Sequence, residues 1–220
     1  MSVTTATLEF RLPGRWIQLD PRNKEASLAE IKGFVARVGS KRDDAAKARA
    51  ILSENLRATL EQAQTSEFQS IFICEEIAEG VPFPATITVY EPDLRMSPAV
   101  GTSPEAVIGT LRKALAEMGV EGVDEAVEID LEEAKALRIT RHQVTSMPHD
   151  LDEAATAGVG AGTDVIDHPT LAVDYWYTRP GTKRFVVASF FTPVADAPHV
   201  IADFFDNVVR ASRVVVPHPA

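Results

Sequence analysis

The segment Leu171–Thr192, with the sequence LAVDYWYTRPGTKRFVVASFFT, is the clearest β-hairpin in this chain. Two runs rich in aromatic and β-branched residues, Leu171–Tyr177 and Phe185–Thr192, flank a polar connection. Pro180 and Gly181 stand at the two central positions of that connection. This is the pattern of a type II turn, because its second central residue needs a positive φ. The segment therefore predicts two antiparallel strands joined by a tight turn.

Further strands are predicted on both sides of this hairpin. The segment Glu67–Ile77 is apolar on both faces, which indicates a central strand covered on two sides. Phe72 from this strand and Phe190 from the hairpin are expected at the centre of the sheet. The other predicted strands are Thr5–Leu12, Thr86–Tyr90, Ala126–Leu131 and Ala136–Thr145, which alternate polar and apolar residues, and the candidate edge strand Val214–Val216.

Four helices are predicted from capping residues and apolar stripes. Ser27 precedes Glu30 by three residues, which is the spacing of a capping box. Pro104 suits the first position of a helix, and Gly119 suits the position just after its end. The expected helix starts are Ser27, Ser40, Ser103 and Asp196.

The order of the elements predicts an α+β fold. Consecutive strands are joined by short connections, which implies antiparallel pairing. The strands do not alternate regularly with helices, so a doubly wound parallel sheet is not expected. We expect a single domain over residues 1–220, with one mainly antiparallel sheet flanked by helices. Residues 146–168 are expected to form a mobile loop, because they hold three glycines within five residues and have no apolar periodicity.

Three packing segments carry a resemblance to a known group of proteins. They are Pro13-Gly14-Arg15-Trp16, the strand Val186–Pro193, and Phe204-Phe205-Asp206. These segments resemble small actinobacterial α+β proteins of unknown role, and the order of elements is similar to the PsbP-like fold of LpqN-like proteins. The resemblance implies a sandwich in which helices flank an antiparallel sheet, and it implies no catalytic residue.

Composition and charge narrow the classes of partner. The chain has 220 residues and a formal net charge of −10. This argues against nucleic acid and against insertion into an anionic membrane, since both need clustered Lys and Arg. Cys74 is the only cysteine, so a disulfide scaffold is excluded and a reducing compartment fits. The first ten residues lack the pattern of a signal peptide, and we expect a cytoplasmic protein.

Two groups of residues are candidate ligand sites. Gly158, Gly160 and Gly162 are spaced like a phosphate loop, but no strand precedes them and no helix follows. His142, His149 and His168 lie among several aspartates, but no pair has the spacing of a helical zinc site. A flexible loop is the preferred interpretation of both groups. We therefore predict no metal and no cofactor.

No catalytic residue is predicted either. Cys74 lies on the apolar strand, where a buried thiol stays protonated and unreactive. Ser189 and Thr192 of the strand Phe185–Thr192 lack the Gly-x-Ser-x-Gly pattern of a nucleophile elbow.

A candidate partner-binding face is predicted on the first strand of the hairpin. Asp174, Trp176 and Thr178 share one face by strand alternation, and that face combines an aromatic residue with polar ones. The preferred hypothesis is a noncatalytic protein-interaction or accessory module whose partner is another protein. The alternative is a small-ligand-binding protein or an enzyme with a site near residues 146–168. An exposed aromatic patch would favour the first, and a deep pocket with convergent polar groups the second.

Overall fold

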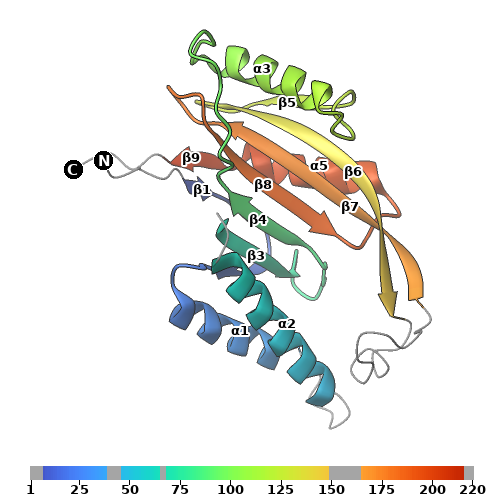
Figure 1. Ribbon diagram of the computed structural model, residues 1–220. Helices are drawn as coiled ribbons and strands as arrows, with labels where there is room; N and C mark the ends of the chain where they lie inside the picture. Colours follow the sequence, from blue (N-terminus) through green and yellow to red (C-terminus); the bar gives the residue numbers. More distant parts are fainter. Residues whose placement is uncertain (1–6, 39–45, 65–67, 149–164, 216–220) are drawn as a thin grey trace.

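The computed structural model describes residues 7–38, 46–64, 68–148 and 165–215. Within these ranges the protein has four helices, a seven-stranded antiparallel sheet and a separate two-stranded sheet (Figure 1), which confirms the predicted α+β class. The helices are α1 (Lys24–Val38), α2 (Ala46–Gln64), α3 (Pro104–Glu117) and α5 (Pro198–Arg210).

The main sheet has the strand order β2-β3-β4-β8-β7-β6-β5. Its strands are β2 (Arg15–Leu19), β3 (Phe68–Glu76), β4 (Thr86–Tyr90), β5 (Val127–Asp130), β6 (Lys135–Pro148), β7 (Val165–Thr178) and β8 (Phe185–Thr192). The predicted hairpin is β7 and β8, near the middle of this order. In its turn Gly181 has a φ of 68°, and the Thr182 N–H donates to the Arg179 carbonyl at 3.1 Å. The turn chemistry predicted from Pro180 and Gly181 is therefore confirmed.

Helices cover both faces of the main sheet. Helix α5 lies on one face (Figure 1), and its side chains pack against Phe190 and Tyr175 there. On the other face, the described helices cover only the two ends. The α1–α2 pair packs over β2 and β3, and α3 packs over β6. The middle of this second face lies between these two helical layers and contains β4 and β8.

The sequence predicted a single sheet, and the structure adds a second, two-stranded one. It consists of β1 (Thr7–Glu9) and β9 (Arg213–Val215), which pair with each other. The Phe10 ring beside β1 packs edge-on against Phe72 and Phe190, at centroid distances of 5.4 and 6.1 Å. These contacts place the small sheet on the α5 side of the main sheet. They also confirm that Phe72 and Phe190 lie in the central core.

The starts of the helices are confirmed in one case and corrected in another. Ser103 caps α3 as predicted, because its hydroxyl accepts a hydrogen bond from the Ala106 N–H. Helix α1 begins before Ser27, and the Asn23 side chain accepts from the Ala26 N–H at its start. The Ser27 hydroxyl is buried and bonds both backbone groups of Asp20 instead. The predicted start at Ser40 lies outside the described residues.

The structure corrects both ends of the loop predicted at residues 146–168. Strands β6 and β7 pair without a register shift from Ala136↔Tyr177 to Pro148↔Val165, so both ends of the predicted loop are strand. Cross-strand hydrogen bonding extends the strands here although the sequence shows no apolar alternation. The central part of the prediction, with its three glycines, lies outside the described residues.

Candidate functional site

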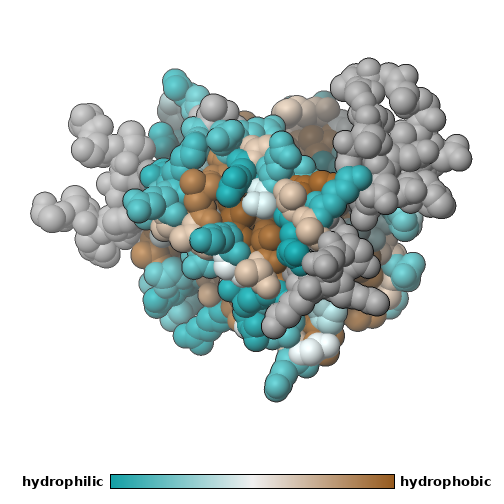
Figure 2. Space-filling view, turned by 90° about the horizontal axis from the view of Figure 1, so that it is seen from below, coloured by the Kyte–Doolittle hydropathy of each residue, from teal (hydrophilic) through white to brown (hydrophobic). Residues whose placement is uncertain are grey.

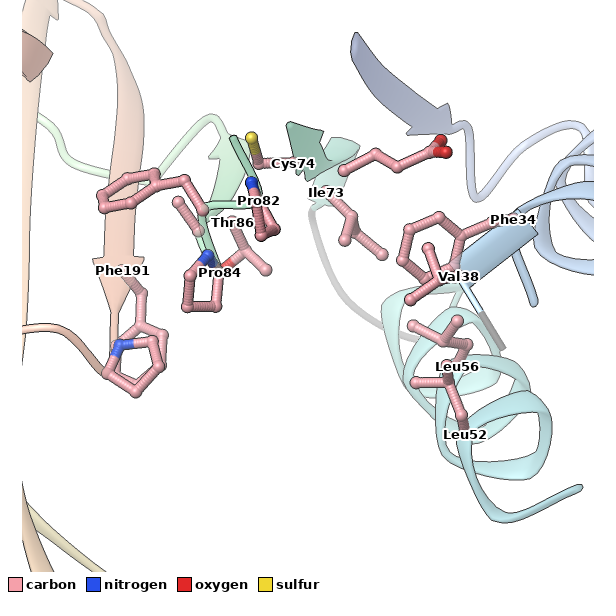
Figure 3. Close-up of a pocket in the computed structure, with 14 residues that line it drawn as sticks. Phe34, Val38, Leu52, Leu56, Ile73, Cys74, Pro82, Pro84, Thr86 and Phe191 are labelled. Carbon is pink, nitrogen blue, oxygen red and sulfur yellow. The ribbon is translucent and has the colours of Figure 1, made fainter. Parts of the chain in front are cut away.

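The main candidate site is an apolar cleft between the α1–α2 pair and the strands β4 and β8. Its volume is about 360 Å³. Figure 3 shows side chains of α1 and α2 on one side and those of β4, β8 and the β3–β4 connection facing them across the opening. The labelled apolar wall residues are Phe34 and Val38 of α1, Leu52 and Leu56 of α2, and Ile73, Pro82, Pro84 and Phe191.

The apolar stripe of the helix pair is longer than the sheet beneath it, and this creates the cleft. Ile31 and Leu60 are fully buried against β2 and β3. Leu52 and Leu56 are only half-buried, and Val38 is 50% exposed at the end of α1. Figure 2 shows the molecule from below the view of Figure 1, and apolar side chains are gathered in the middle of that face. Exposed apolar surface of this kind marks interaction sites in soluble proteins.

A second, more polar pocket adjoins the cleft on the open part of the sheet. It has a volume of about 460 Å³ and shares Phe191 with the cleft. Thr86 lines the first pocket and Thr88 the second, and residues two apart on a strand point to the same face. The second pocket is lined by Phe68, Thr88, Tyr90, Ser189 and Phe191. The two pockets therefore form one surface with an apolar part and a hydroxyl-bearing part.

An ion pair lies at the centre of this open face. Arg141 of β6 pairs with Asp174 of β7, and the Ser189 hydroxyl donates to the other Asp174 oxygen at 2.6 Å. Burial raises the pKa of the Tyr90 phenol, the charge of Asp174 raises it further, and Arg141 opposes the shift. Tyr90 is therefore a neutral hydroxyl at physiological pH. These groups offer hydrogen bonds with no net charge.

The structure places the three predicted partner-binding residues mostly inside the protein. Asp174 is 8% exposed and is held by the ion pair, and Thr178 is 1% exposed. The Thr178 hydroxyl bonds the backbone N–H and carbonyl of Lys135. Trp176 is half-buried and packs edge-on against Phe185 within the α3 cluster. The prediction that this face is open is therefore wrong at Thr178, whose buried hydroxyl is bonded to the backbone of Lys135, and the α3 cluster packs against the neighbouring Trp176.

The signal for the cleft was present in the sequence but was assigned to the core. Phe34 and Val38 belong to a helical stripe that predicts a buried face, and the stripe does not say how far its cover extends. The segment Pro82-Phe83-Pro84 lies in the short connection between the predicted strands Glu67–Ile77 and Thr86–Tyr90, and all three residues line the cleft. Only the packing of α2 beside this segment brings the two walls together.

The remaining candidates offer little chemistry in the described ranges. There, no group of three or more His, Cys, Asp or Glu side chains is placed to hold a metal ion. His142 and His168 are exposed on the β6–β7 pair, and His149 lies outside the described residues. In the same ranges, no helix combines the length and hydrophobicity that crossing a membrane requires.

The buried thiol at Cys74 is expected to be unreactive. Burial raises its pKa to about 12, and the charges of Glu75 and Glu76 add to the shift. The thiolate is therefore scarce at pH 8 in the folded protein. We expect iodoacetamide to alkylate Cys74 at least about a hundredfold more slowly than in the unfolded chain, as measured by mass spectrometry. Equal rates in native buffer and in denaturant would show that the thiol is accessible and ionised.

Comparisons with known proteins do not assign the chain to a family. No known family model matches it, and no curated protein is significantly similar to it. The resemblance to PsbP-like and LpqN-like proteins therefore stays a prediction from the sequence.

Proposed function

We propose that this protein is a noncatalytic interaction module, and that its apolar cleft receives an apolar side chain of a partner protein. The observation that carries the proposal is a solvent-open cleft walled by apolar side chains from α1, α2, β3, β8 and the β3–β4 connection. Interfaces commonly anchor a partner by inserting a few aromatic or aliphatic side chains into such pockets.

The chemistry of the walls favours a protein over a small molecule. Small-ligand sites orient their ligand with several convergent polar groups. Among the described wall residues, the one ionisable group besides Cys74 is Glu75, and its carboxylate is paired with Arg15 and Arg37. A protein partner supplies its own polar contacts at the rim. The net charge of −10 favours a neutral or basic partner and disfavours nucleic acid, and the single buried Cys74 fits a cytoplasmic location.

A small amphipathic ligand is the second candidate. The adjoining pocket supports it, because Thr88, Tyr90 and Ser189 bring hydroxyl groups beside the apolar cleft. Such a ligand would place its apolar body against Phe191 and its polar part toward these hydroxyls. This places the alternative site on the open sheet face, some way along the chain from residues 146–168.

The substitution Val38→Asp tests the cleft. Val38 is 50% exposed, so the folded protein tolerates the change, but any ligand in the cleft would bury an unpaired carboxylate. We expect capture of the partner from the host lysate to weaken by at least about tenfold. The fluorescence of an apolar dye, anilinonaphthalene sulfonate, bound to the native protein should fall as well.

Val200→Asp is the matched control. Val200 is also an exposed valine on a helix, with 56% exposure, but it lies on α5 and does not line the cleft. It should leave capture and dye binding unchanged. Equal losses in both variants, or none in Val38→Asp, would contradict the cleft as the binding site. A small molecule that copurifies with the wild type and is absent from Val38→Asp would favour the second candidate.

A further inference from the structure

Strand β6 has a long outer edge without a partner strand in the described part of the chain. Strand β5 pairs with it only from Lys135 to Arg138, whereas β6 continues to Pro148. Figure 1 shows the β6–β7 pair continuing past the end of β8. An unpaired edge presents a row of N–H and carbonyl groups that can pair with another strand.

The alternation of hydrogen bonds identifies which residues face outward. Lys135 directs its N–H and carbonyl toward Thr178 on β7, so odd-numbered residues of β6 face β7. Even-numbered residues face the outer edge. Gly122 confirms this at Thr140, since a Cβ on the glycine would lie 2.4 Å from the Thr140 carbonyl oxygen. Beyond this contact, the outward backbone groups are those of His142, Val144 and Ser146.

The exposed part of this edge lacks the usual protection against strand pairing. Residues 142–147, HQVTSM, include no lysine, arginine, acidic residue or proline, and Val144 is 67% exposed. The opposite edge of the sheet is different. Strand β2 is shorter, has a register shift after Arg15, and holds Arg15 in ion pairs with Glu75 and Glu76. Charges and bulges of that kind discourage pairing. In β6 the charged residues Lys135, Arg138 and Arg141 precede residues 142–147, and its pairing with β7 has no register shift.

We propose that the β6 edges of two copies of this chain pair antiparallel about Val144, forming a two-fold symmetric dimer with a continuous sheet. The two-fold axis sets each residue at the centre against its own copy, so a charged residue there would repel itself. Here Val144 meets Val144 of the second copy, and Gln143 meets Thr145. This uncharged, self-compatible segment fits a second copy although each chain has a net charge of −10. The pairing does not depend on the proposed function.

Cysteine cross-linking tests the proposed register. Directly opposed residues of a hydrogen-bonded antiparallel pair have Cα atoms about 5.5 Å apart, which lies within the range of a disulfide. Mild oxidation of Val144→Cys should therefore give a covalent dimer, seen on a nonreducing gel. Val127→Cys is the control, since Val127 is an exposed valine on β5 at the same end of the sheet. The native Cys74 is buried and should not contribute.

Sedimentation equilibrium measures the association directly. The wild type should sediment as a dimer, Val144→Lys as a monomer with an unchanged melting temperature, and Val127→Lys as a dimer. A monomeric wild type would overturn the proposal. So would a dimer that persists in Val144→Lys, or a cross-link that forms through Val127→Cys and not through Val144→Cys.

Discussion

Replacing Phe190 by alanine is expected to lower the free energy of unfolding by about 3–5 kcal/mol. The side chain, on β8, is fully buried. Its ring centroid lies 4.8 Å from that of Phe205 and 5.1 Å from that of Tyr175. Removing it leaves a cavity between the sheet and α5 that these large rings fill only in part. Urea denaturation followed by circular dichroism measures the change.

The adjacent residue provides the matched control for this prediction. Phe191 points to the opposite face, where it is half-buried in the wall of the cleft. Phe191→Ala should therefore destabilise the protein less than Phe190→Ala, while weakening whatever binds in the cleft. Equal destabilisation by the two changes would mean that the cleft face is packed like the core, and the cleft would no longer be an open binding surface.

Replacing Asp206 by alanine is also expected to lower the free energy of unfolding by about 3–5 kcal/mol. Asp206 is buried on α5, where it accepts hydrogen bonds from the Tyr175 hydroxyl and the Arg138 guanidinium, both at 2.7 Å. Its removal leaves Arg138 largely buried without its counter-ion. The change is measured by the same denaturation experiment.

Two control substitutions test whether the loss of stability comes from the buried charge of Asp206. Asp203→Ala, on an exposed site of the same helix, should have little effect. Asp206→Asn keeps the shape of the side chain and one acceptor for the Tyr175 hydroxyl. Its loss of unfolding free energy should therefore fall between the losses of Asp203→Ala and Asp206→Ala. If Asp206→Ala were as stable as Asp203→Ala, the network would contribute nothing to folding.

The same network sets an expectation for alkaline pH. Burial raises the pKa of Tyr175 well above 10.0, and the nearby Asp206 raises it further. The protonated phenol is therefore favoured in the folded state. Its contribution to stability should be complete below pH 10 and should be lost as the pH rises from there toward the higher pKa of the folded state.

Much of the fold could be predicted because local patterns have local causes. Gly181 supplies a positive φ whatever surrounds it, and Ser103 caps a helix with its own side chain. The expectation that Phe190 of the hairpin lies at the centre of the sheet is confirmed. An apolar stripe likewise predicted the last helix, whose side chains pack against Phe190.

The candidate site could not be predicted in the same way. The sequence showed that Asp174, Trp176 and Thr178 share a face, but not that α3, far away along the chain, packs against Trp176 on that face. It showed an apolar stripe through Phe34 and Val38, but not that the stripe extends past the strands that cover the rest of it. A sequence pattern shows which side chains are apolar and favour burial. Which of them are buried depends on where distant segments of the chain pack, and only the tertiary structure decides that.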